Sequence, residues 1–91
     1  MLKKIYRVYD LIPTKYGHER ANIAIYRRLK EAKRDARKRV KSLRKEITAL
    51  GETRGVAIED IHSGNYIYRW KVTKKGIEKK KGGYAGDSWS L

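Results

Sequence analysis

The spacing of apolar residues changes along the chain and divides it into strands and one helix. Residues 3–12 carry β-branched, aromatic and aliphatic side chains up to Pro13, which predicts a first strand. Residues 14–17 have the composition of a turn, and the short apolar run at residues 21–26 predicts a second strand. Over residues 29–50 the apolar residues recur every three or four positions, which predicts an amphipathic helix.

The predicted helix has one continuous apolar stripe. Gly51, directly after the stripe, is a typical stop signal for a helix. Ala21 and Ile25 continue the same spacing towards the N-terminus, so a single helix that begins near Glu19 is the alternative to the second strand. The strand is preferred because helices of more than about 25 residues are uncommon in small domains. The stripe consists of Leu29, Ala32, Ala36, Val40, Leu43, Ile47 and Leu50.

The second half of the chain predicts a hairpin. Residues 56–61 and 66–73 have strand composition, and residues 62–65 supply Gly and Asn for the turn between them. Strict alternation in the later strand predicts that Tyr66, Tyr68, Trp70 and Val72 share the face under the helix, with Ile67, Arg69, Lys71 and Thr73 on the open face. Residues 76–91 are rich in Lys and Gly and are expected to form a flexible basic tail.

These elements predict a small two-layer α+β domain over residues 1–75. An antiparallel sheet would carry one long amphipathic helix across one face in the order ββαββ, or βαββ if residues 19–28 are helical. A chain of 91 residues has room for one modest core.

The cellular location is expected to be the cytoplasm, or the host cytoplasm if the protein is viral. The chain has no cysteine, which excludes a disulfide framework and suits a reducing compartment. No apolar run approaches the roughly 20 residues that span a bilayer, so no membrane partner is expected. The first residues alternate charge with hydrophobe and lack the apolar core of a signal peptide.

Net charge is the strongest indication of the kind of partner that this protein binds. The sequence has 24 Lys and Arg residues against 10 Asp and Glu residues, a net charge of +14 with a pI near 10.2. Self-repulsion at this density destabilises a compact state, so a neutralising polyanion is the expected partner, and nucleic acid is the commonest one.

The charge is concentrated on the predicted helix. Between residues 27 and 45, eleven basic residues stand against Glu31 and Asp35, a net charge of +9. A solvated helix usually interleaves both signs, whereas Arg37 and Lys41 here form a repulsive i,i+4 step. A row of one sign favours contact with phosphates, and a solvated charged face is the alternative. The expected nucleic-acid-binding residues are Arg27, Arg28, Lys30, Lys33, Arg34, Arg37, Lys38, Lys41, Arg44, Lys45, Arg69 and Lys71.

Neither base-specific recognition nor catalysis is indicated. The only side-chain amides are Asn22 and Asn65, so shape-based or sequence-independent binding to DNA or RNA is expected. The chain has no Gly-rich phosphate loop and no zinc-ligand spacing, so no enzyme activity, metal or cofactor is expected. A metal-dependent nuclease would have to be built from Asp10, Glu59, Asp60 and His62, for which a polar hairpin end is the preferred interpretation.

The run EAKRDA at residues 31–36, after a strand, resembles short proteins of phages and mobile elements. This resemblance covers less than half of the chain, implies a small accessory or anti-defence role, and identifies no site residue. The alternative function is therefore an inhibitor of the anti-CRISPR kind that docks on an acidic protein or on a nucleic-acid-binding surface of a host ribonucleoprotein. The oligomeric state is left open.

Overall fold

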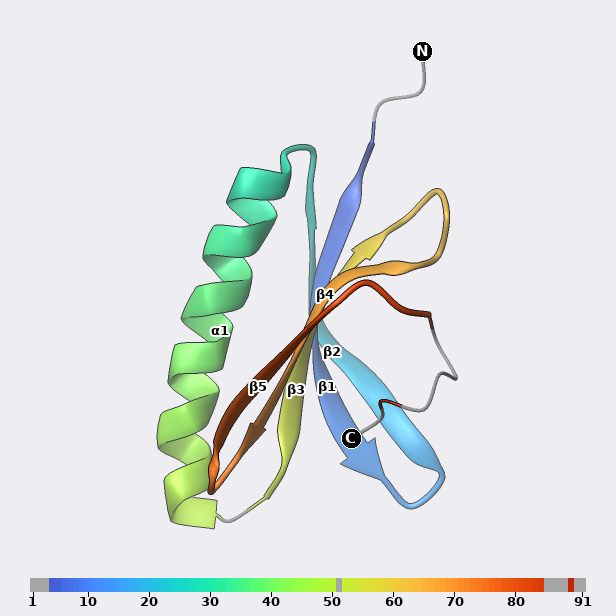
Figure 1. Ribbon diagram of the computed structural model, residues 1–91. Coiled ribbons are helices and arrows are strands. Elements are labelled where there is room, and N and C mark those ends of the chain that lie inside the picture. The colour runs from blue at the N-terminus through green and yellow to red at the C-terminus, as the bar shows by residue number, and fades with distance from the viewer. Residues whose placement is uncertain (1–3, 51, 85–88, 90–91) are drawn as a thin grey trace.

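The computed structural model describes residues 4–50, 52–84 and 89 (Figure 1). The elements are β1 (Tyr6–Thr14), β2 (Gly17–Tyr26), α1 (Leu29–Leu50), β3 (Arg54–Asp60), β4 (Tyr66–Thr73) and β5 (Gly76–Lys81). The strands form one antiparallel sheet in the order β2-β1-β3-β4-β5. Figure 1 shows α1 running along one face of this strongly twisted sheet. The predicted α+β class and the order ββαββ are confirmed, with a fifth strand added at the end.

The apolar stripe of α1 forms the main core with one face of the sheet. The helix has the predicted bounds, and its Ala32 and Ala36 are fully buried, which lets the helix backbone approach the strands closely. Val40 lies at the centre of the stripe and is 6% exposed. The sheet contributes Tyr6, Val8, Val56, Ile58, Trp70 and Val72 to the same cluster. Burial of this stripe fixes which way every charged side chain of α1 points.

The first hairpin resolves the choice between strand and helix before residue 29. Residues 17–26 are β2, paired antiparallel to β1 through a turn at Lys15 and Tyr16, so the preferred strand is confirmed. Pro13, expected to end the first strand, lies within β1 instead. Pairing between β1 and β3 stops at Leu11, so β1 has a neighbour on one side only at Pro13, and a proline is tolerated at such an edge.

A bulge interrupts β2 opposite Tyr9. The β1–β2 register shifts between Val8 and Asp10, and Asn22 in the bulge has a φ of 53°. Asn is among the few non-glycine residues that adopt this left-handed conformation readily. Its side-chain Nδ2 donates a hydrogen bond of 2.8 Å to Asp10 Oδ2, which holds the bulge in place.

A second irregularity corrects the predicted faces of β4. Tyr68, Trp70 and Val72 pack under α1 as predicted, but Tyr66 lies on the opposite face and joins Tyr9, Leu11 and Ala57 in a small second cluster. Ile67 instead packs against the main core. The β3–β4 register shifts between Ile58 and Glu59, and a bulge of this kind reverses the alternation beyond it.

The predicted tail is wrong for residues 76–81. These residues form β5, which pairs with β4 through a tight turn at Lys74 and Lys75. Lysine-rich composition hid the strand, because an edge strand with one solvated side needs few apolar residues. Further along, Trp89 contacts the sheet, whereas residues 85–88 and 90–91 lie outside the described residues. In the part of the chain that is described, no helix is long and apolar enough to cross a membrane.

Replacement of Val40 by Asp should unfold the domain. The substitution places a carboxylate at the centre of the buried stripe, and an unpartnered buried charge costs several kcal/mol. Urea unfolding followed by circular dichroism would show loss of the transition. Ser42→Asp, which adds the same charge at an exposed position of α1, should unfold like the parent. A Val40→Asp variant as stable as the parent would mean that the helix is packed in another register.

Candidate functional site

Charges of opposite sign lie on opposite flanks of α1. The acidic residues Glu31, Asp35 and Glu46 lie towards β2, next to Tyr26, Asp10 and Asn22. The flank towards β5 carries basic residues, and their row continues over the outward crest, where Arg34 and Lys38 also lie beside the acids. We call these residues the basic flank: Lys30, Lys33, Arg34, Arg37, Lys38, Lys41, Arg44 and Lys45. The 3.6-residue period of the helix turns the order of charges in the sequence into this separation in space.

On the acidic side, a compact ion-pair network ties α1 to the first hairpin. Asp35 accepts hydrogen bonds from Tyr26 Oη at 2.7 Å and from Arg39 Nε at 3.0 Å. Arg39 also donates through Nη1 to Asp10 at 3.2 Å. Arg39 therefore has two carboxylate partners within the fold, which sets it apart from the other basic residues of the helix.

The pKa values of this network show which protonation states it favours. Burial alone would raise the pKa of Asp35, but the hydrogen bonds from Arg39 and Tyr26 outweigh burial and lower it. The hydrogen bond to Asp35 raises the pKa of the Tyr26 phenol. The network is thus held together by an ionised Asp35 and a protonated Tyr26.

Within the described part of the chain, most residues of the basic flank lack a carboxylate partner of the kind that Arg39 has. Seven of its residues form no ion pair with any of the described residues: Lys30, Lys33, Arg34, Arg37, Lys38, Lys41 and Lys45. All members of the flank are exposed except Lys33, which is half-buried. Arg27 and Arg28, in the connection from β2 to α1, are also exposed and extend the basic surface beyond the start of the helix.

A groove of about 610 Å³ runs between α1 and the edge of the sheet. We call it the α1–β5 groove. One wall and the rim are basic side chains of α1 from Lys30 to Arg44, and the floor is formed by Val40, Trp70 and Ile77. Figure 1 shows β5 beside α1 on this side of the molecule. The groove thus combines an apolar floor with a rim of one charge sign.

Strand β5 adds more basic groups beside the groove. Lys79 and Lys81 pair with Trp70 and Tyr68 of β4 and therefore point to the helix side of the sheet. The Lys79 ammonium lies 4.4 Å from the centre of the Tyr68 ring, and Lys33 lies 4.8 Å from the same centre. Hydrogen bonding to Lys33 and the positive charge of the lysines lower the pKa of Tyr68. This end of the sheet therefore has a strongly positive potential.

On the open face, Arg69 holds Trp89 against the sheet. Its side chain is 4% exposed and lies between the rings of Tyr66 and Trp89, 4.6 and 5.0 Å from their centres. It donates hydrogen bonds to the backbone oxygens of Trp89 and Gly82. Lys71 lies 4.8 Å from the centre of the same Trp89 ring. Both residues are on the open face as predicted, but the structure places them on the other side of the sheet from the basic flank.

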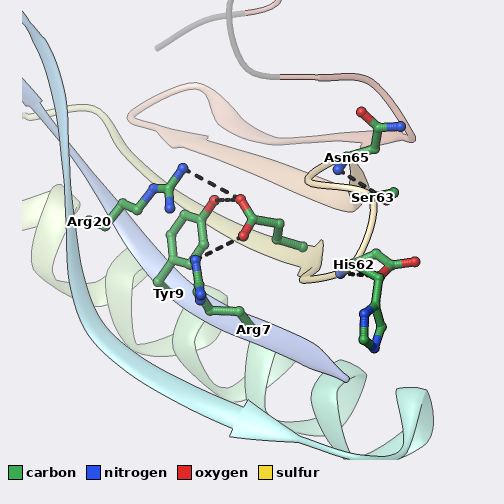
Figure 2. Close-up of polar contacts among 8 residues, drawn as sticks. Arg7, Tyr9, Arg20, His62, Ser63 and Asn65 are labelled. Atoms are coloured by element: carbon green, nitrogen blue, oxygen red, sulfur yellow. Dashed lines mark hydrogen bonds and ion pairs between the residues drawn. The ribbon is translucent and has the colours of Figure 1, made fainter. Parts of the chain in front are cut away.

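A buried carboxylate organises the rest of the open face. Glu59 is 5% exposed and accepts hydrogen bonds from Arg7 and from the Tyr9 hydroxyl, each at 3.1 Å. Arg20 lies 3.5 Å from the same carboxylate, and Figure 2 shows Arg7, Tyr9 and Arg20 gathered around one point. Burial, followed by the hydrogen bond with Tyr66, raises the pKa of the Tyr9 phenol. Two arginines and a protonated phenol thus satisfy the buried charge.

The structure does not bring the four residues considered for a nuclease together. Asp10 is on the helix side of the sheet with Arg39, whereas Glu59 is on the open face. Asp60 accepts a hydrogen bond from the backbone N–H of His62 in the turn between β3 and β4, and Figure 2 shows His62 in that turn. Among the described residues, no three His, Asp or Glu side chains are close enough together to hold a metal ion.

The sequence predicted the basic side chains of α1 but not the part that β5 contributes to the groove and to the cations beside it. Lys79, Lys81 and Ile77 belong to the segment that was expected to be a tail. The alternation of Ile77, Lys79 and Lys81 with Glu78 and Lys80 was the available signal, although it is short and almost wholly charged.

Comparison with protein-family models, with curated proteins and with solved structures finds no match to this chain.

Replacement of Asp35 by Asn should destabilise the fold in a pH-dependent way. The folded-state pKa of Asp35 lies below its ordinary value of 3.8, so its contribution is present above that pH and is lost as the pH falls through the folded-state value. At pH 7 the variant should lose about 1–3 kcal/mol of the free energy of unfolding. The difference from the parent should shrink in urea titrations below pH 3.8.

Glu46→Gln provides the control for this substitution, because it removes a carboxylate from an exposed position on the same flank. It should leave the free energy of unfolding nearly unchanged across the same pH range. Equal effects of the two variants would contradict a specific role for the Asp35 network.

Proposed function

We propose that this protein binds nucleic acid through the basic flank of α1, with little dependence on base sequence. The observation that carries the proposal is the separation of charge on the helix. The acids of α1 lie towards β2, and the basic flank continues across the α1–β5 groove onto Lys79 and Lys81. A polyanion that lay along the α1–β5 groove would meet none of these carboxylates, because no acid among the described residues lines the groove.

The cost of this arrangement supports the proposal. Like charges at i,i+4 repel, and each pair costs a few tenths of a kcal/mol in a helix. Several such pairs stand on the basic flank, among them Arg34 with Lys38 and Arg37 with Lys41. Phosphates placed along the flank would offset the repulsion between neighbouring cations, because each phosphate would attract more than one of them.

The proposed binding mode is contact with the phosphate backbone. Lys and Arg on an exposed helix hold phosphates, which position a protein on nucleic acid without reading its sequence. The amide side chain of Asn22 is engaged with Asp10 in the β2 bulge and does not line the α1–β5 groove, so it supports no base readout there. A protein of this kind would act in the cytoplasm, where its cysteine-free sequence is well suited to the reducing conditions.

The double substitution Arg37→Glu with Lys41→Glu should weaken nucleic-acid binding broadly across sequences. Both positions are exposed, so the fold should survive. Affinity at low salt should fall at least about tenfold. The slope of log K against log salt should become shallower by about one for each lost phosphate contact. Fluorescence anisotropy with labelled DNA and RNA over a salt series measures both quantities.

Lys4→Glu with Lys15→Glu is the matched control. It makes the same change in net charge at two exposed positions outside α1. The control should bind more tightly than the helix variant at every salt concentration. Equal losses in the two variants would mean that net charge alone drives binding. Poly-glutamate as a competitor tests the acidic-protein alternative, which gains support if it displaces nucleic acid at equal charge.

A further inference from the structure

We infer that the α1–β5 groove binds single-stranded nucleic acid, with unpaired bases on its apolar floor and phosphates along its basic rim. The inference rests on the proposed function and narrows its ligand to one class. The groove combines a basic rim with an apolar floor, and phosphate contact explains only the rim.

The groove is long enough for more than a single phosphate. Its helical wall extends from Lys30 to Arg44, which at 1.5 Å per residue is about 21 Å. Basic side chains occur on every turn of this wall, at Arg34, Arg37 and Lys41 between the two ends. A backbone that follows the groove would therefore meet a cation at each turn of the helix.

The floor of the groove offers a contact that phosphates do not use. Ile77 is 41% exposed at the sheet edge, and Val40 and Trp70 lie beside it, each 6% exposed. The Tyr68 ring follows Trp70 along the same side of β4, with the two ring centres 5.9 Å apart. An apolar floor in a basic groove has no role in binding phosphates, whereas it suits the flat face of a nucleobase.

This combination favours a single strand over a duplex. A duplex presents phosphates on the outside and keeps its base faces stacked within, so it would contact the rim and leave the floor exposed to water. Proteins that bind single strands without sequence preference combine a basic groove with aromatic side chains on which bases stack. The α1–β5 groove has both parts, and its basic wall is rigid because it is a helix packed on the core.

The experiment compares three probes of one length: an oligothymidylate, an abasic strand with the same phosphates, and a duplex. Fluorescence anisotropy at one salt concentration should give the oligothymidylate an affinity about tenfold above that of the abasic strand. The oligothymidylate should also bind more tightly than the duplex. Equal binding of the abasic strand, or tighter binding of the duplex, would overturn the inference and leave the proposed function intact. Failure of all three to bind would overturn the proposed function itself.

Two matched substitutions locate the base contact. Ile77→Thr keeps a β-branched residue in β5 and removes apolar surface from the floor, so oligothymidylate affinity should fall by about threefold or more while abasic affinity is unchanged. Ile25→Thr makes the same change on β2, where Ile25 is 62% exposed at the opposite edge of the sheet. It should alter neither affinity. Equal effects of the two variants on the oligothymidylate would place the bases elsewhere.

Discussion

Packing of the α1 stripe against the centre of the sheet is the contact on which the surface chemistry of this protein depends. The close approach at Ala32 and Ala36 and the burial of Val40 allow one rotational setting of the helix about its axis. That setting directs the acids towards β2 and the basic flank towards β5. The hydrophobic contact therefore determines the electrostatic field, although no charged residue takes part in it.

The ion pairs of the fold add to the uneven distribution of charge around α1 that packing creates. Arg39 pairs with Asp10 and Asp35, Arg54 pairs with Glu52, and both Arg7 and Arg20 pair with Glu59. These pairs lie on the acidic side of the helix, on the open face and at the start of β3. The arginines of these ion pairs are thus different residues from Arg34 and Arg37, which are exposed on the basic flank. Net charge alone would not have distinguished the two groups.

The sequence predicted the elements with strong periodicity and failed where periodicity is broken or masked. The bounds of α1 follow from the apolar stripe, of which Ala32, Ala36, Val40, Leu43 and Ile47 are buried in the core. The reversed faces of Tyr66 and Ile67 depend on a bulge opposite Glu59, which a local pattern does not reveal. The floor of the groove depends in part on Ile77 of β5, a strand whose lysine-rich sequence resembles a solvated tail until its pairing with β4 is known. The basic wall was thus predictable, and the groove required tertiary contacts.

The two outer strands of the sheet differ in a way that bears on behaviour at high concentration. On β5, closely spaced lysines line the outer strand, so a second copy that approached along it would meet strong repulsion. On β2 the charge is low and Ile23 and Ile25 are exposed, but the left-handed residue Asn22 kinks the strand and breaks the regular row of backbone donors and acceptors. Open-ended growth of the sheet from molecule to molecule is therefore opposed by charge at one end and by backbone geometry at the other. Only the geometric barrier would persist once salt or a bound polyanion has screened the charge.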